Sequence, residues 1–398
     1  MLRRCFPPKI PSRPPRPLIG PQPSRPSSEN AAEKPKAPGR PAGMPSEFTG
    51  YDGSAISVEE LPFDVMRRTK NFTTLHLLDR DVSKAFASLI IDKIPKEQTF
   101  IAEMNPGIGL MTQQLLDSGV SVVHGYDKFT EFMQWLHPLS KRYPGRLHLR
   151  PFNLATIAKT DFLDGKINSR NMDKMFEGIR PRDWRGPPAI AVIGAVPNVN
   201  FFYSFQWSLV NQYLSDYGRA VLFVAVSPST SLALTDDPNT KHFHKPKNIF
   251  LRTFFDFRKL GTLPRNAFYP WVPEKTWRKR FAEYYKGDSE IMDVVKIEAR
   301  ADFFTEDFTR SDAIIFYYFL SIHMKTRNTR IIPVLEKWIP GCGPRLIRED
   351  YDIYSTFDEL NSEQLLQLFK TFKSWPEYET SPFINFVETI IQSKGTEE

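Results

Sequence analysis

The sequence predicts an α/β fold with a doubly wound, mostly parallel sheet, followed by a helical C-terminal domain. Strand-length apolar runs alternate with helix-length amphipathic segments between residues 98 and 226. Because helix-length crossovers join parallel strands, this alternation favours a parallel sheet with helices on both faces. Beyond about residue 310 the strand pattern stops, and only helical periodicity continues.

Five apolar runs are expected to form the first strands, at residues 98–104, 120–127, 146–152, 189–195 and 219–226. Two later runs, 248–257 and 293–300, are expected to complete the sheet. Amphipathic helices are expected at 311–324, 330–339, 361–375 and 381–391. The chain therefore divides into a tail over 1–50, an α/β domain over 51–305 and a helical domain over 306–398.

The tail differs in composition from the rest of the chain. Residues 1–50 hold 13 of the 34 prolines, and nine Lys or Arg residues against three Glu. Such a segment buries too little apolar surface to offset its ordering entropy, so we expect it to be disordered. Its first 28 residues contain no acid and six positive charges, which is typical of a mitochondrial presequence. Because prolines interrupt any long helix there, a basic proline-rich linker is the alternative.

Composition excludes some classes of protein. The net charge is +7, and +6 of it falls in the tail, so nucleic acid would have to bind to a locally basic face of the folded part. No apolar run reaches the ~20 residues that a membrane-spanning helix needs, so no membrane insertion is expected. The cysteines, Cys5 and Cys342, are too few and too far apart for a zinc site. No metal site is expected.

The strongest local motif follows the first predicted strand. Gly107 and Gly109 allow a tight turn just before a helix N-terminus, with Glu103 ahead of them. Asp127 ends the next strand, where an acid can accept hydrogen bonds from ribose hydroxyls. The third glycine of a dinucleotide-binding motif is absent, because Thr112 occupies its position. A Rossmann-like methyltransferase therefore fits the pattern better than a dehydrogenase.

These residues resemble the first motif of the rRNA adenine dimethyltransferase superfamily, E-x-x-P-G-x-G-x-x-T, which spans residues 103–112. Residues 75–90 and 263–274 resemble the segments before and after that superfamily's central sheet. Asn105, the segment IGAVPN at 193–198 and residues 351–377 are more similar to mitochondrial transcription factor B, particularly its second animal paralogue. The resemblance covers roughly residues 70–395 and implies a Rossmann-like class I methyltransferase fold.

The resemblance also implies a site for S-adenosylmethionine. Two positions depart from the family: Gly125 stands where it has an acidic ribose ligand, and Pro151 where it has an Asp that accepts from the adenine amino group. Asn153 is the nearby polar residue. These departures predict weak or vestigial cofactor binding. The positions that match the family's cofactor-binding residues are Leu78, Glu103, Asn105, Gly107, Gly109, Gly125, Asp127 and Pro151.

In the family, a catalytic Asn-Leu-Pro-Tyr ends the fourth strand. Its Asn side chain and Pro carbonyl accept hydrogen bonds from the target amine, and its aromatic ring stacks on the flipped base. Because the amide and the ring are both absent here, methyl transfer is not expected unless Phe201 or Phe202 supplies a ring. The matching positions, called the degenerate tetrad below, are Ala195, Val196, Pro197 and Asn198.

Basic and aromatic residues alternate between residues 241 and 286. Such segments offer phosphate contacts together with flat stacking faces, the two elements of single-strand binding. Burial of the aromatic residues in the core is the alternative. The candidate nucleic-acid contacts are Lys245, Lys247, Arg265, Arg278, Lys279 and Arg280.

Three functions follow from these patterns. The first is a transcription initiation factor of the mitochondrial matrix and nucleoid, which joins the mitochondrial RNA polymerase and holds the melted strand of promoter DNA. The second is an S-adenosylmethionine-dependent N6-adenine dimethyltransferase of mitochondrial small-subunit rRNA. The third is a small-molecule methyltransferase, which the C-terminal helices disfavour. The loss of the tetrad favours the first function over the second.

Overall fold

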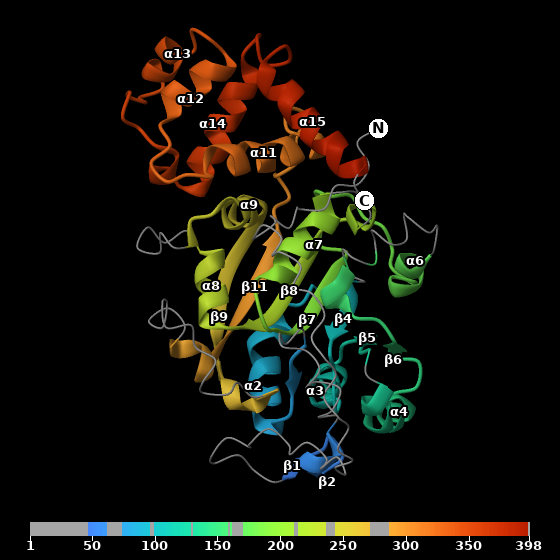
Figure 1. The fold of residues 1–398 in the computed structure, drawn as a ribbon. Coiled ribbons are helices and arrows are strands. Elements are labelled where there is room, and N and C mark those ends of the chain that lie inside the picture. Colours follow the sequence, from blue (N-terminus) through green and yellow to red (C-terminus); the bar gives the residue numbers. More distant parts are fainter. Residues whose placement is uncertain are drawn as a thin grey trace, which may run out of the picture.

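The computed structural model describes residues 47–61, 74–95, 99–128, 130–157, 160, 170–210, 214–235, 243–270 and 286–396. These residues form a seven-stranded sheet with helices on both faces and a further group of helices at one end (Figure 1). A small hairpin precedes the sheet, made of β1 (Glu47–Thr49) and β2 (Ala55–Ser57). The expected end of the tail at residue 50 cuts through this hairpin.

The sheet has the strand order β6-β5-β4-β7-β8-β11-β9. All neighbours from β6 to β8 are parallel, whereas β11 is antiparallel to both β8 and β9. The predicted mostly parallel sheet is therefore confirmed. Strand order reverses between β4 and β7, and such a switch point is where α/β sheets bind ligands beyond the carboxyl ends of the strands. The strands are β4 (Phe100–Met104), β5 (Val123–Tyr126), β6 (Leu147–Arg150), β7 (Ile190–Val196), β8 (Ala220–Val226), β9 (Phe255–Pro264) and β11 (Ile291–Ala299).

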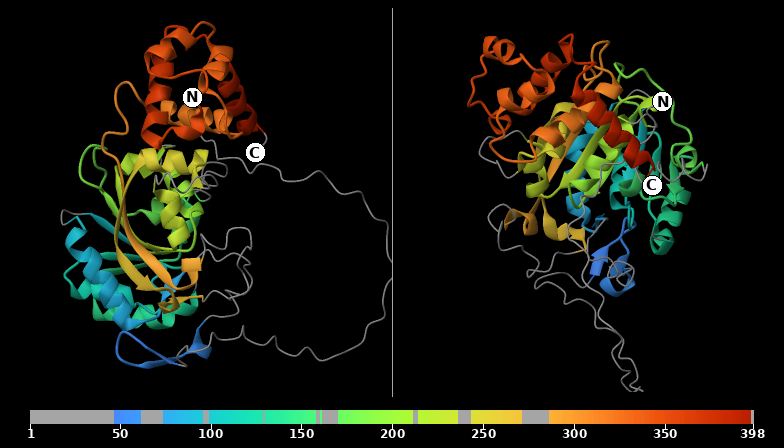
Figure 2. Two further views of the ribbon diagram at one scale, coloured as in Figure 1. Left: turned by 90° about the vertical axis from the view of Figure 1, so that its left-hand side faces the viewer. Right: turned by 45° about the horizontal axis from the view of Figure 1, so that its top comes forward.

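Helices cover both faces of the sheet, as Figure 2 shows edge-on. Side chains of the central strands alternate between the two faces, so Ile101 lies in one hydrophobic cluster while Phe100 and Ala102 lie in the other. One face packs against α2 (Arg80–Ile90), α3 (Leu110–Asp117) and α4 (Met133–Arg142). The other packs against α6 (Asn171–Met175), α7 (Asn200–Val210), α8 (Pro228–Leu234) and α9 (Pro246–Phe254).

The strand expected at residues 248–257 is wrong over most of its length. Helix α9 occupies this stretch up to Phe254, and β9 begins only at Phe255. Pro246 stands at the first helical position, where its fixed φ favours a helix start. A short apolar run has no periodicity that distinguishes a buried helix from a buried strand, which explains the error.

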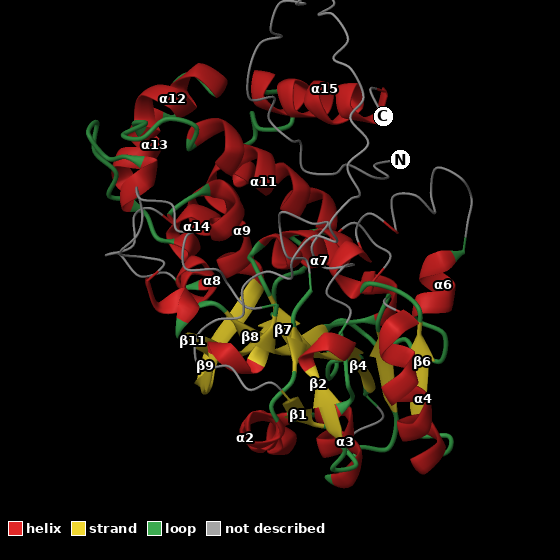
Figure 3. Cartoon of the chain, turned by 60° about the horizontal axis from the view of Figure 1, so that its bottom comes forward, coloured by secondary structure: helices red, strands yellow, loops and turns green. Residues whose placement is uncertain are grey.

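The chain ends in five helices after β11 (Figure 3), and the four expected ones are confirmed. Thr309 and Asp312 form a capping box at the start of the first of them. Aromatic contacts join the first of these helices to α9 and α7, which cover the sheet: the ring centroids of Phe250 and Phe316 lie 6.2 Å apart, and those of Trp207 and Tyr317 lie 5.4 Å apart. The helices are α11 (Arg310–His323), α12 (Ile331–Trp338), the unpredicted α13 (Gly343–Arg348), α14 (Ser362–Ser374) and α15 (Pro382–Thr396).

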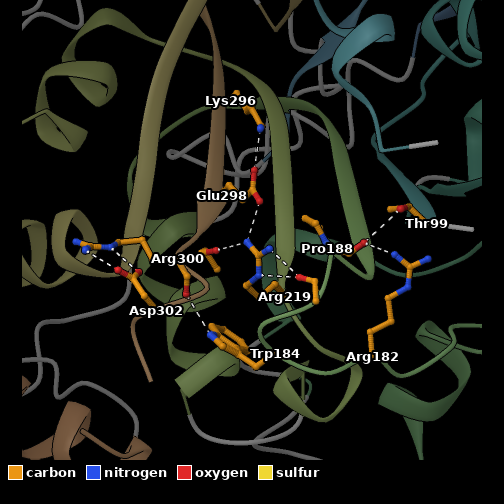
Figure 4. A network of polar contacts seen from close by, with 11 residues as sticks. Thr99, Arg182, Trp184, Pro188, Arg219, Lys296, Glu298, Arg300 and Asp302 are labelled. Carbon is orange, nitrogen blue, oxygen red and sulfur yellow. Dashed lines mark hydrogen bonds and ion pairs between the residues drawn. The ribbon is translucent and has the colours of Figure 1, made fainter. Parts of the chain in front are cut away.

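A polar network stabilises the end of the sheet at which the central strands β7 and β8 begin (Figure 4). The buried Arg219 donates to the carbonyl oxygens of Gly186 and Ala299 and pairs with Glu298 at 2.8 Å. This edge is thus occupied by structural contacts. Within the described ranges, no helix is long and apolar enough to cross a membrane, and no group of three or more His, Cys, Asp or Glu could hold a metal ion.

Candidate functional site

The turn after β4 keeps a tight, left-handed backbone. Asn105 has φ +52° and donates its N–H to the carbonyl of Tyr126 at 2.9 Å. Asn is among the few residues that adopt this region readily, so it can replace the glycine that most methylating relatives carry. Gly109 has φ +82°, and a Cβ there would lie 2.7 Å from Cδ2 of Leu139. Asn105 and Gly109 therefore both suit the tight backbone of this turn.

Glu103 is buried below this turn. Its Oε2 accepts a hydrogen bond from the hydroxyl of Thr112 at 2.6 Å. Burial raises the pKa of Glu103 to about 8. The hydrogen bond from Thr112 lowers this pKa in part, and the nearby Asp127 carboxylate contributes to raising it. At neutral pH the side chain is mainly protonated, so it joins β4 to α3 as a neutral group.

Asp127 also points inward. Its Oδ2 accepts from the N–H of Gly107 at 3.4 Å and lies 3.7 Å from Nδ1 of His76, and both side chains are fully buried. Burial holds the pKa of His76 at about 3, so the imidazole is neutral, and its ring lies 4.4 Å from that of Phe132. The acid that was expected to meet a ribose thus supports the turn. His76 was missed, because nothing in its sequence context distinguishes it from a core histidine.

The remaining cofactor positions offer few polar groups. A Cβ at Gly125 would lie 3.4 Å from Cγ of Pro106, so the position of the family's acid is packed by the turn. Pro151 follows β6 and brings no acceptor in its side chain. Asn153 uses its Oδ1 to accept from the N–H of Ala155 at 2.9 Å, which caps the short 3-10 helix Leu154–Thr156. Neither Gly125 nor Pro151 therefore brings a polar side chain to this end of the sheet.

A small cavity of about 20 Å³ lies beside the carboxyl ends of β4 and β7. Its walls include Glu103, Asn105, Gly194 and Ala195, and Nδ2 of Asn105 has no hydrogen-bond partner among the described residues. Leu78 is buried, and it donates its N–H to the carbonyl of Ala267. A cavity of this size holds about one water molecule.

The degenerate tetrad forms the end of β7 and the approach to α7. Ala195 and Val196 are buried in the strand, and Pro197 and Asn198 are half-buried. Oδ1 of Asn198 accepts from the N–H of Asn200 at 3.0 Å, a contact that starts α7. The proposed substitution of a ring is wrong, because Phe201 and Phe202 are buried in the core, the former stacked on Phe205.

The nucleic-acid candidates fall into three groups. The prediction that Arg265 contacts phosphate is wrong. Its guanidinium is buried and donates to the carbonyls of Phe268 and Pro270, so it stabilises a turn and cannot contact phosphate. At the start of α9, Lys245 is exposed and Lys247 is half-buried, and Nζ of Lys247 lies 5.5 Å from the ring centroid of Tyr203. The positions 278–280 lie outside the described residues.

Strand order, the reversed β11 and the glycine turn after β4 together define a class I methyltransferase fold. Solved structures that align with the chain include the 23S rRNA methyltransferase ErmE, at a TM-score of 0.46 and 14% identity over 75% of this chain and 100% of that chain. A dimethyladenosine transferase from Plasmodium falciparum aligns at a TM-score of 0.46 and 12% identity, over 73% of this chain and 95% of that chain. No protein-family model matches the chain.

Sequence comparison confirms the resemblance to the rRNA adenine dimethyltransferase superfamily and to its second mitochondrial paralogue. Dimethyladenosine transferase 2, mitochondrial, of Drosophila melanogaster is 25% identical over 338 residues, which cover 73% of this chain and 74% of that protein. The Homo sapiens protein of the same name is 21% identical over 276 residues, which cover 67% of this chain and 68% of that protein.

Proposed function

We propose that this chain is a mitochondrial transcription initiation factor that assists the mitochondrial RNA polymerase in promoter melting. The observation that supports this most is the end of β7, where Ala195 and Val196 are buried and Asn198 is committed to the start of α7. Of the four positions where the family methylates a base, only Asn198 carries a side-chain amide, its Oδ1 is used at the start of α7, and none carries a ring. The frame is kept, while its base-modifying groups are not.

The residues of the predicted cofactor site support the same proposal. Asp127 is engaged by Gly107 and His76, and Gly125 and Pro151 remove two partners that the family offers to S-adenosylmethionine. The resemblance thus implies a cofactor site whose polar groups are turned to other uses. We expect weak or vestigial binding of the cofactor and derive no step that depends on it.

A place for an unpaired strand lies beside the tetrad. Tyr203 stands in the first turn of α7, and Lys247 approaches its ring from α9. A cation next to an aromatic face supplies the phosphate contact and the stacking surface that single strands require. The proposal therefore puts melted promoter DNA at the junction of α7 and α9, with Lys245 at its rim.

Run-off transcription by the mitochondrial RNA polymerase tests this role. We expect Lys245→Ala combined with Lys247→Ala to weaken transcription from duplex promoters and to lower the salt slope by roughly one per lost phosphate contact. The loss should be much smaller on a premelted template, because opening costs about 1.4 kcal/mol per base-pair step. Lys325→Ala with Lys337→Ala removes the same charge from exposed positions elsewhere and serves as control. Equal losses on both templates would contradict a role in melting.

The alternative function is an S-adenosylmethionine-dependent N6,N6-dimethyltransferase of mitochondrial small-subunit rRNA. The names of the relatives favour it, since they are mitochondrial dimethyladenosine transferases. The retained E-x-x-P-G-x-G-x-x-T turn agrees with it as well. The groups at the end of β7 count against it.

We propose that the mature protein works in the mitochondrial matrix. Two observations support this: the relatives are mitochondrial by name, and residues 1–28 carry six basic residues and no acid. A reporter fused to residues 1–50 should enter mitochondria, which fluorescence microscopy or fractionation measures. Retention of the fusion in the cytosol would count against the proposal.

A further inference from the structure

A groove of about 750 Å³ lies at the amino ends of the strands, whereas the glycine turn lies at their carboxyl ends. It runs along the amino ends of β4, β5 and β6 and is lined by the loop 118–122, by Thr99 and by Arg180. Its volume is in the range of small-molecule sites, roughly 300–1,000 Å³. The proposed promoter contact is elsewhere, at the start of α7, so this groove is not part of it.

Three aromatic rings form a ladder along the groove, one from each strand. The rings of Phe100 and His124 are stacked with centroids 3.9 Å apart and an interplanar angle of 13°. Those of His124 and His148 are 5.1 Å apart at 19°. His124 and His148 are register partners in the parallel pair of β5 and β6, which holds them in line. Since β6 is the edge strand and His148 is exposed, the ladder ends in an accessible ring.

Hydrogen bonding does not explain why His124, the middle ring of the ladder, is buried. His124 is only 9% exposed, and its Nδ1 has no hydrogen-bond partner within the described ranges. Burial, together with the positive charge of Arg150 and the neighbouring His148, lowers the pKa of His124 to about 3. The ring is therefore neutral at physiological pH. A neutral imidazole stacked on Phe100 gives His148 a rigid aromatic support.

We propose that this groove binds a nucleotide, whose base stacks on His148 and whose phosphate faces Arg180. Nucleobases stack on histidine as they do on other aromatic side chains, and each such stack contributes substantially to binding. Ser118 and Ser121, which also line the groove, carry hydroxyl groups that can donate to or accept from base edges. Arg180 is exposed at the rim, where a guanidinium can pair with phosphate. A free nucleotide and one unpaired residue of a single strand share this chemistry.

Photolabelling of the full chain tests the proposal and separates the two sources. The probes are 8-azidoadenosine monophosphate and a single-stranded RNA of about ten nucleotides that carries the same base. We expect the label in peptides that contain residues 118–124 or 146–150. Labelling by the mononucleotide identifies a free nucleotide as a ligand, whereas labelling by the RNA alone identifies a single strand. Label confined to other peptides would overturn the proposal.

Substitutions of His148, the last ring of the ladder, measure how much it contributes to the affinity for the probe. His148→Ala should weaken binding of the labelling probe by about fivefold or more, as expected for one lost stack, and His148→Phe should restore it. His137→Ala, a change of the same residue at an exposed position of α4, should leave binding unchanged. Wild-type affinity in His148→Ala would overturn the stacking role. This outcome is independent of promoter melting, because no polymerase or promoter is present.

Discussion

The ends of β4 and β7 lie side by side at the switch point, and they have changed in different ways. After β4 the backbone turns tightly, with Asn105 and Gly109 in the left-handed region. After β7 it keeps one proline of four residues, and the strand leads directly into a helix whose first phenylalanines are buried. The turn after β4 thus holds buried polar groups in contact with one another, whereas the end of β7 is mostly apolar.

This difference shows that the shape of a cofactor turn can persist for structural reasons. Asp127, His76 and Gly107 form an internal contact that supports the turn without any ligand. Nothing similar could preserve an amide and an aromatic ring at the end of β7, because their use requires a base to be present. A tight turn at one strand end is therefore weak evidence for activity at the other.

The largest expected effect concerns the contact between the two strands. Gly194 in β7 has φ +153°, and a Cβ there would lie 2.7 Å from the carbonyl oxygen of Met104 in β4. Gly194→Ala should therefore lower the free energy of unfolding by about 3 kcal/mol or more, since backbone of a central strand cannot move aside. Urea denaturation measures this loss.

Gly119→Ala is the matched control for that substitution. Gly119 has φ +91°, but nothing lies within 4 Å of the added Cβ. Only the left-handed strain of about 1–2 kcal/mol should appear. Equal losses in the two variants would show that the close approach of β4 and β7 does not constrain the switch point.

A pH-dependent effect should follow from Glu103. A carboxyl group whose pKa is raised by folding contributes stability that is complete below its ordinary pKa, near 4.5, and is lost as the pH rises through about 8. Wild-type stability should fall over this window by up to about 1.4 kcal/mol per pH unit. Glu103→Gln cannot ionise and should show a much flatter profile, measured by urea denaturation at several pH values. Parallel profiles would mean that Glu103 is not buried as a neutral acid.

Much of the fold could be predicted because its signals are local. The runs of β7 and β8 are apolar throughout and were read directly as buried strands. The helix α14 carries regular apolar spacing and a polar start at Asn361. The run that became α9 had no such periodicity, and α13 is too short to show one. Length and periodicity thus decided which elements could be predicted.

The candidate site was harder to predict, because the role of each side chain depends on contacts with residues that are distant in the sequence. Residue type placed Asp127 at the end of a strand, but only the fold shows that its carboxylate is buried beside His76, from an earlier strand. Arg265 has the composition of a phosphate contact, yet its guanidinium is buried on two carbonyls. Neither burial nor the partner of a polar side chain is encoded by its immediate neighbours.

Methyl transfer is the most direct test of the central claim, that a methyltransferase frame is kept here without its reaction. The measurement is incorporation of labelled methyl groups from S-adenosylmethionine into a small-subunit rRNA hairpin, with an active rRNA adenine dimethyltransferase as positive control. We predict incorporation no higher than that of a heat-denatured sample, because Ala195 and Asn198 replace the family's amide and ring and Asp127 is engaged inside the turn. Robust dimethylation of the hairpin adenines would contradict the account.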